Sequence, residues 1–144
     1  MSERSRVHSA DGRDRAIAVV RGFYEAKDVP AMLNFLDDQL EWRAPESLPW
    51  GGTFRGHDGY RDFFEIVVDQ IAEFRREKQV YLDAGERIVV LLRSVGRPEG
   101  GTEWDLPEVH VWTVRDGKAL DMETYVDTAI VLRALPPQPT AVGA

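Results

Sequence analysis

His110 is the side chain best placed by this sequence to do acid–base chemistry. It lies in the run Val109-His110-Val111-Trp112, and of the three histidines in the chain it alone is flanked by apolar residues typical of a strand. Imidazole titrates near neutral pH, so a ring that points from a strand into an apolar interior can donate or accept a proton where water is scarce. We therefore expect His110 on the wall of a pocket. The alternative is a core histidine that a neighbouring hydroxyl or carbonyl satisfies.

The composition excludes several other kinds of chemistry and partner. The net charge is −7, from 25 acidic and 18 basic residues, which disfavours nucleic acid as a partner. The sequence has no cysteine, no histidine pair at metal-binding spacing, and no apolar run near the roughly 18 residues that cross a membrane. We expect no metal, no cofactor and no membrane contact. The Arg-rich start lacks the apolar core of a secretory signal, so we expect a cytoplasmic protein.

Helical patterns come first along the chain, and strand patterns follow. Apolar spacing predicts helices from Asp14, from Pro30 and after Asp58, with a final short helix over 128–135. Strands are predicted over 40–44, 74–83, 87–96, 102–115 and 119–126. This order predicts an α+β fold in which N-terminal helices pack on a curved antiparallel sheet and leave a cone-shaped cavity. One domain would span 14–135, between a disordered N-terminal tail (1–13) and a disordered Pro-rich C-terminal tail (136–144).

The turn before the last strand decides which way His110 faces. A three-residue turn over 115–117 would put His110 on an apolar face shared with Trp112, Leu120, Met122 and Thr124. A two-residue turn over 116–117 would instead set His110 opposite Glu123. We favour the first register, because it gives the alternation that buries apolar side chains. In that register Glu123 and Asp121 point away from the cavity, whereas the directions of Asp105, Glu108 and Asp127 stay open.

Over residues 14–135 the chain resembles a known superfamily. The segments that carry the resemblance are Phe23-Tyr24-Glu25-Ala26, Leu40-Glu41-Trp42-Arg43-Ala44-Pro45, Trp50-Gly51-Gly52-Thr53-Phe54-Arg55-Gly56, and the closing run from Val109 to Lys118. They are similar to segments of nuclear transport factor 2, the ketosteroid isomerases and the SnoaL-like polyketide cyclases. The resemblance implies the cone-shaped α+β fold and a homodimer formed through the outer surface of the sheet. The same fold hosts several reactions, so it does not choose among them.

The resemblance also implies which positions carry polar groups. His110 falls where ketosteroid isomerases have a protonated aspartic acid and where SnoaL-like cyclases have a pocket histidine. The catalytic base of the isomerases falls on Ala44 and their helical tyrosine near Val20, while the SnoaL-like catalytic aspartate falls on Thr124. None of these three side chains is an acid or base, so His110 needs another partner. Glu46, two residues past the expected base position, is the nearest carboxylate along the chain and our catalytic candidate beside His110; the alternative is a solvated loop carboxylate.

Aromatic and apolar residues near these positions predict a chamber for a flat hydrophobic ligand. Its expected wall consists of Tyr24, Trp42, Trp50, Phe54, Phe64, Trp112, Met122 and Thr124. Core packing or a dimer face is the alternative role for such residues. The resemblance implies a cofactor-independent isomerase or lyase of secondary metabolism, acting as a cyclase, isomerase or dehydratase on a hydrophobic polyketide- or terpenoid-like metabolite. The alternative is a non-catalytic module that binds a small hydrophobic ligand or serves dimerisation.

Overall fold

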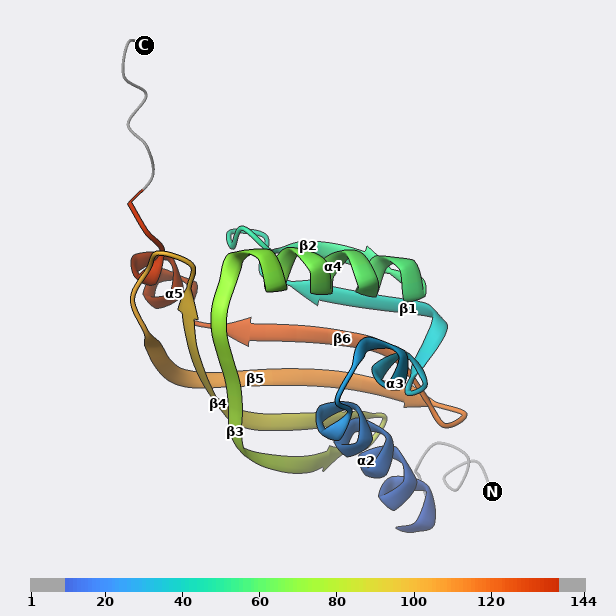
Figure 1. Cartoon of the computed structure of the whole chain (residues 1–144). Helices are drawn as coiled ribbons and strands as arrows, with labels where there is room; N and C mark the ends of the chain where they lie inside the picture. The colour runs from blue at the N-terminus through green and yellow to red at the C-terminus, as the bar shows by residue number, and fades with distance from the viewer. Residues whose placement is uncertain (1–9, 138–144) are drawn as a thin grey trace.

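Six strands form a single curved sheet in this computed structural model, which describes residues 10–137 (Figure 1). The elements are α2 (Ala10–Glu25), α3 (Val29–Leu33), β1 (Leu36–Ala44), β2 (Gly52–Arg55), α4 (Gly56–Gln70), β3 (Ile71–Ala84), β4 (Arg87–Pro98), β5 (Trp104–Arg115), β6 (Lys118–Val126) and α5 (Thr128–Ala134). The strand order is β2-β1-β6-β5-β4-β3, and only the β1–β6 pair is parallel. The predicted α+β class is confirmed. Within residues 10–137, no helix is long and apolar enough to cross a membrane.

The predicted tails are tested only in part. Residues 1–9 and 138–144 lie outside the described residues, so the predicted disorder there stays a prediction. Helix α2 begins at Ala10, inside the segment 1–13 that we expected to be a tail. The domain therefore begins earlier along the chain than the apolar spacing indicated.

Helices α2 and α4 pack on the inner face of the sheet because each carries an apolar stripe. Ala16, Val20 and Phe23 of α2 lie about one helical turn apart, and all three are buried. In α4 the buried residues are Tyr60 and Phe63. The rings of these helices contact Trp42 of β1 and Trp112 of β5, which also contact each other at 5.7 Å between ring centroids. These aromatic contacts form the centre of the core.

Two predicted elements between α2 and α4 differ from the structure. The predicted second helix ends after one turn as α3, capped by Asp28, whose carboxylate accepts from the backbone of Ala31 at 2.8 Å. The apolar residues after it enter β1 instead, because Leu36 pairs with Ala119 of β6. The predicted Gly-rich loop contains a strand, β2, which pairs with β1. Both changes arise from strand pairing, with the distant β6 in the first case and with the preceding β1 in the second, which overrides local pattern.

Strand β5 supplies the inner wall of the sheet. Every second residue along it is buried, in the order Trp104, Leu106, Glu108, His110, Trp112 and Val114. At its start Trp104 packs against Gly96 of β4, where a Cβ atom would lie 2.3 Å from the indole ring. Two of the six inward positions carry ionisable side chains, and they are neighbours on this face. The strand thus brings Glu108 beside His110.

The β5–β6 hairpin combines parts of both predicted registers. Arg115 pairs with Lys118 across a two-residue turn at 116–117, whose residues both have positive φ, 54° and 78°. The predicted three-residue turn is therefore wrong, because this sequence adopts the conformation typical of type I′ hairpins. A bulge near Val114 then shifts the register by one residue, so His110 pairs with Thr124 and not with Glu123. The bulge restores Met122 and Thr124 to the predicted apolar face around His110, whereas Ala119 takes the buried position that we expected for Leu120.

Candidate active site

Both ring nitrogens of His110 are engaged in a chain of hydrogen bonds. His110 Nδ1 lies 2.5 Å from the Tyr24 hydroxyl, and Nε2 lies 2.5 Å from Glu108 Oε2. The indole N–H of Trp112 donates to the Tyr24 hydroxyl at 3.0 Å. We call the three ionisable groups the Tyr24–His110–Glu108 chain. His110 is 1% exposed and Glu108 7% exposed, so this chain is shielded from bulk water.

Secondary structure explains how these side chains meet. Glu108, His110 and Trp112 occupy alternate positions of β5 and therefore point to the same face of the sheet. Tyr24 comes from the last turn of α2, directly after Phe23, which packs against Trp112 with ring centroids 5.1 Å apart. The Tyr24 and His110 rings lie nearly parallel, at 15° and 5.8 Å. The packing of α2 on β5 thus fixes the hydroxyl against the imidazole.

Burial and neighbouring charges set the protonation state of each group. For His110, burial lowers the pKa below its usual value and outweighs the raising effect of Glu108. For Glu108, burial alone would raise the pKa, but the hydrogen bond and charge of His110, together with Arg76, lower it overall. Burial raises the pKa of Tyr24 far above its ordinary value. At neutral pH the chain therefore consists of a carboxylate, a neutral imidazole and a phenol.

Only one arrangement of protons satisfies these states. An ionised Glu108 can only accept, so Nε2 of His110 carries the hydrogen. Nδ1 is then an acceptor, and the Tyr24 hydroxyl donates to it while accepting from Trp112. The imidazole is left as a base whose available nitrogen faces Tyr24. Because the carboxylate, ring and hydroxyl are aligned in this order, Tyr24 can pass its proton to His110 while it takes up another one, whereas its raised pKa disfavours loss of the proton alone.

We expect the free energy of unfolding to fall as the pH decreases below about 6.5, the usual pKa of histidine. In the unfolded chain His110 gains a proton there, whereas the folded state holds it neutral, so acid favours unfolding by up to about 1.4 kcal/mol per pH unit. Glu108, with its lowered pKa, adds a further loss below its usual value of 4.5. Urea unfolding of the wild type at about pH 7 and about pH 5.5 measures the effect.

Two histidine variants supply the controls for this pH dependence. His110→Gln is expected to reduce the loss of stability between the two pH values. His57→Gln changes a histidine outside the Tyr24–His110–Glu108 chain, whose Nε2 lies 2.7 Å from the backbone oxygen of Leu36, and is expected to keep the loss. An equal loss in all three proteins would show that His110 is not held neutral in the folded state.

A cavity of about 130 Å³ lies beside the chain of hydrogen bonds. Of the predicted wall residues, it is lined by Tyr24, Trp42, Trp50, Phe64 and Thr124. Glu108 and Arg76 also line it, whereas His110 does not. Tyr24 and Glu108, the two ends of the Tyr24–His110–Glu108 chain, therefore face the cavity. The imidazole of His110 lies between them.

Three other predicted wall residues belong to the core around the cavity. Trp112 and Met122 are fully buried, and Phe54 packs against Phe63 with ring centroids 5.2 Å apart. None of the three lines the cavity. Trp112 still acts on the site, through its hydrogen bond to Tyr24. Five of the eight expected wall residues thus line the cavity, and the other three pack around it.

The structure does not bring Glu46 to His110. Glu46 is exposed in the turn after β1 and does not line the cavity. The structure therefore corrects our expectation that Glu46 is the partner of His110. The turn carries its side chain outward, while Pro45 and Leu48 on either side line the cavity. Glu108 takes the place of Glu46. The sequence signal for Glu108 is its position two residues before His110 in a strand, because residues at this spacing share a face.

The carboxylates of β6 point away from the cavity, as predicted. Arg43 on the outer face holds Asp121 and Glu123 at 2.7 Å each, and Glu41 at 2.9 Å. These acids are therefore paired with Arg43 on the outer face and do not join the Tyr24–His110–Glu108 chain. In the part of the chain that the structure describes, no group of three histidine or acidic residues is arranged to hold a metal ion.

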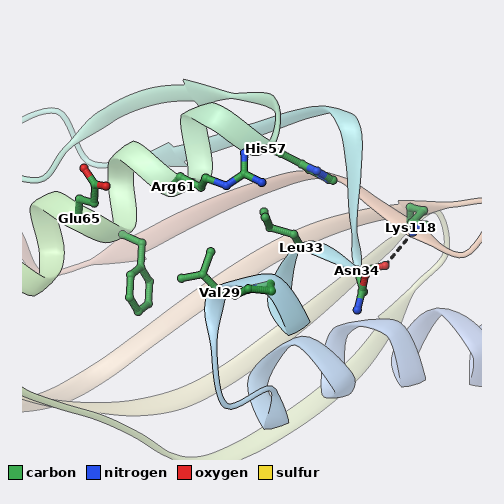
Figure 2. Close-up of a pocket in the computed structure, with 9 residues that line it drawn as sticks. Val29, Leu33, Asn34, His57, Arg61, Glu65 and Lys118 are labelled. Atoms are coloured by element: carbon green, nitrogen blue, oxygen red, sulfur yellow. Dashed lines mark hydrogen bonds between the residues drawn. The ribbon is translucent and has the colours of Figure 1, made fainter.

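A second hollow lies at the surface between α3 and α4 (Figure 2). This groove measures about 570 Å³, and Val29, Leu33, His57 and Arg61 lie along it. Lys118 closes one end by donating to the backbone oxygen of Asn34 at 2.8 Å. Phe64 lines both the groove and the buried cavity. Its side chain therefore lies at the boundary between the cavity and this surface.

The SnoaL-like domain family matches residues 16–122. An NTF2-like protein of unknown function from Burkholderia pseudomallei K96243 is 33% identical, with a TM-score of 0.80 over 85% of this chain and 98% of that one. TerC, crystallised with polyporic acid, is 29% identical, with a TM-score of 0.78 over 83% and 97% of the two chains.

A third solved structure supports the fold alone. It is a candidate polyketide cyclase from Xanthomonas campestris pv. campestris, 24% identical, with a TM-score of 0.72 over 85% of this chain and 97% of that one. No curated protein sequence matches the chain significantly. The family match covers most of the domain, including the larger part of α2, all of β5 and the Tyr24–His110–Glu108 chain. The protein therefore belongs to the family of SnoaL-like domains, with the NTF2-like fold.

Proposed function

We propose that this protein is a cofactor-independent enzyme that moves protons on a small hydrophobic metabolite, as a SnoaL-like cyclase, isomerase or dehydratase. The observation that carries the proposal is the Tyr24–His110–Glu108 chain, whose tyrosine and glutamate ends both line a cavity with aromatic walls. A carboxylate, a neutral imidazole and a hydroxyl in this order form a base with a relay. The small organic ligand of TerC supports a ligand of this general kind.

Proton transfer would begin at Tyr24, the hydroxyl next to the ligand. Its oxygen takes a proton from an acidic C–H or O–H of the ligand while its own proton moves to Nδ1 of His110. The ligand becomes an anion and His110 becomes an imidazolium, which the Glu108 carboxylate stabilises. Returning the proton at another atom isomerises the ligand, and returning it to a departing hydroxyl dehydrates it. Attack of the carbanion on a carbonyl of the same molecule closes a ring.

This mechanism gives His110 a different place from the one that the sequence suggested. Both of its nitrogens are occupied and it does not line the cavity, so it acts through Tyr24. The lowered pKa of His110 makes the imidazolium short-lived, which favours return of the proton to the ligand. Tyr24 is then the catalytic residue that touches the ligand. His110 and Glu108 set its reactivity.

The size of the cavity favours a ligand of about one ring. Ligand pockets usually measure about 300 to 1,000 Å³, and this one measures about 130 Å³. A larger ligand would need Phe64 to move and join the cavity to the surface groove. We therefore use a single-ring ketone, cyclohexanone, as the probe of proton transfer.

The test follows exchange of the α-protons of cyclohexanone in D₂O by NMR, with and without the protein. We expect faster exchange with the protein than with the same concentration of free imidazole, because the cavity holds the ketone against Tyr24. A rate no higher than that of free imidazole would contradict the proposal. Binding of cyclohexanone without exchange would favour the non-catalytic binding module instead.

We also propose that the protein forms a homodimer through the outer face of the sheet. One row of paired residues crosses four strands there: Val80, Leu91, Val109 and Tyr125. Leu91 is 41% exposed and Tyr125 54% exposed, and such an apolar row on a solvent-facing sheet is typical of an interface.

Leu91→Glu is expected to convert this dimer to a monomer in sedimentation velocity experiments, because it places a charge at the centre of the row. Val68→Glu is the matched control, since Val68 is an exposed apolar residue on α4, away from the sheet's outer face. It should leave the dimer intact. A monomeric wild type would overturn the proposed dimer.

A further inference from the structure

Arg76 is a cation on the cavity wall whose Nε has no hydrogen-bond acceptor among the described residues. It lies on β3, with its guanidinium carbon 4.7 Å from the centroid of the Phe74 ring and 5.9 Å from that of Tyr24. The nearest carboxylate oxygen, Glu108 Oε2, is 4.0 Å from Arg76 Nε, beyond hydrogen-bond distance. Within residues 10–137, this Nε is buried and without a hydrogen-bond partner.

Other arginines of the sheet show how unusual this is. Arg43 is held by three carboxylates, and Arg93 donates to Asp105 at 2.6 Å. The side chain of Arg76 is 26% exposed, less than that of Arg43 or Arg93. The buried Nε–H is one of the five N–H donors of this guanidinium, and leaving a buried donor unpaired is costly. The site is therefore short of an acceptor.

The neighbours of Arg76 do not supply that acceptor. Glu108 is the acid within reach, and its Oε2 is already bonded to His110. Tyr60 faces the same cavity, but its hydroxyl donates to the sulfur of Met32 at 3.3 Å. Trp42, another wall residue, also has a buried indole N–H with no partner in the part of the chain that the structure describes. Two donors on this wall, Arg76 Nε and the Trp42 indole N–H, thus lack an acceptor.

We propose that Arg76 binds the carboxylate of a ring-sized organic acid in this cavity, so that the substrate class is a cyclic carboxylate. A guanidinium matches a carboxylate with two parallel hydrogen bonds, and the ligand's ring would pack on the aromatic walls. The identification of this acid as the substrate rests on the proposed function, whereas the binding itself does not. Arg76 would orient the ligand so that its acidic hydrogen faces Tyr24.

The test compares benzoate with benzamide, which has the same shape and no charge. Binding is measured by titration of tryptophan fluorescence, since Trp42 and Trp50 line the cavity. We expect the wild type to bind benzoate at least about tenfold more tightly than benzamide. Arg76→Gln should abolish this preference. Arg76→Lys should retain part of it, because lysine keeps the positive charge but cannot form the two parallel hydrogen bonds of a guanidinium. Arg75→Gln is the matched control, since Arg75 is an exposed neighbour on the same strand, paired with Glu77.

The outcomes separate this proposal from the enzymatic one. Equal binding of benzoate and benzamide by the wild type, or no binding of either at millimolar concentration, would overturn it. So would an Arg76→Gln variant that folds and keeps the preference, or an Arg75→Gln variant that loses it to the same extent. If Arg76→Gln does not fold, the proposal is still tested by comparing benzoate with benzamide binding in the wild type and in Arg76→Lys. No turnover enters the measurement, so these results do not depend on whether the Tyr24–His110–Glu108 chain transfers protons.

Discussion

Tyr24→Phe is expected to slow the exchange of cyclohexanone α-protons by at least about a hundredfold, the usual contribution of a positioned acid–base group. Phenylalanine keeps the ring that packs against His110 and Trp112 and removes only the hydroxyl that links the ligand to the imidazole. The fold should survive at a cost of about 1 to 3 kcal/mol for each of the two buried groups left without a partner, His110 Nδ1 and the Trp112 indole N–H. The NMR exchange rate measures the first effect and urea unfolding the second.

The control for this variant is Tyr81→Phe. Tyr81 lies next to Tyr24, with ring centroids 6.1 Å apart, but it does not line the cavity. Its variant should exchange at the wild-type rate. A folded Tyr24→Phe protein with near-wild-type exchange would show that the proton does not pass through Tyr24.

Glu108→Gln is expected to lower the exchange rate by about a hundredfold or more, because the carboxylate is what stabilises the imidazolium formed on His110. The glutamine oxygen can still accept from Nε2, so the ring keeps its orientation while the charge is lost. Glu108 raises the pKa of His110 against burial, so its removal lowers that pKa further. The rate falls in acid when His110 becomes protonated, and this fall should therefore move to lower pH in the variant.

The exchange rate as a function of pH measures both effects of Glu108→Gln. Glu123→Gln is the control, because Glu123 is a carboxylate of the neighbouring strand that faces the outer surface and pairs with Arg43. It should leave rate and pH profile unchanged. Two results for Glu108→Gln would contradict the assigned role of Glu108: a fall of the exchange rate in acid that moves to higher pH, or an exchange rate equal to that of the wild type.

Strand β5 shows how much of the site the sequence could predict. The alternation from Trp104 to Val114 is visible in the sequence, and it correctly placed His110 and Trp112 on one inward face. The same alternation includes Glu108, although a glutamate in a strand is usually solvated and its direction was left open. What the pattern could not supply was the bulge in the β5–β6 hairpin, which sets the register opposite His110.

Other parts of the site depend on contacts between distant segments. Tyr24 reaches His110 only because α2 packs across β5, a separation of 86 residues along the chain. Arg76 stands in the charged run 75–78, which is typical of a solvent-facing edge strand. Its direction inward follows from the pairing of β3 with β4, and a bulge with Lys78 at φ 56° ends this stretch of the pairing. Glu46 was chosen by proximity along the chain, which does not report proximity in space.

The most direct test of the proton relay is the tautomer of His110, read from its ¹⁵N chemical shifts in the wild-type protein. At neutral pH we expect a neutral ring with the hydrogen on Nε2, directed at Glu108, and Nδ1 free to accept from Tyr24. The ring should become an imidazolium only below the usual pKa of 6.5. A hydrogen on Nδ1, or an imidazolium at neutral pH, would contradict the account, because His110 could not then receive a proton from Tyr24.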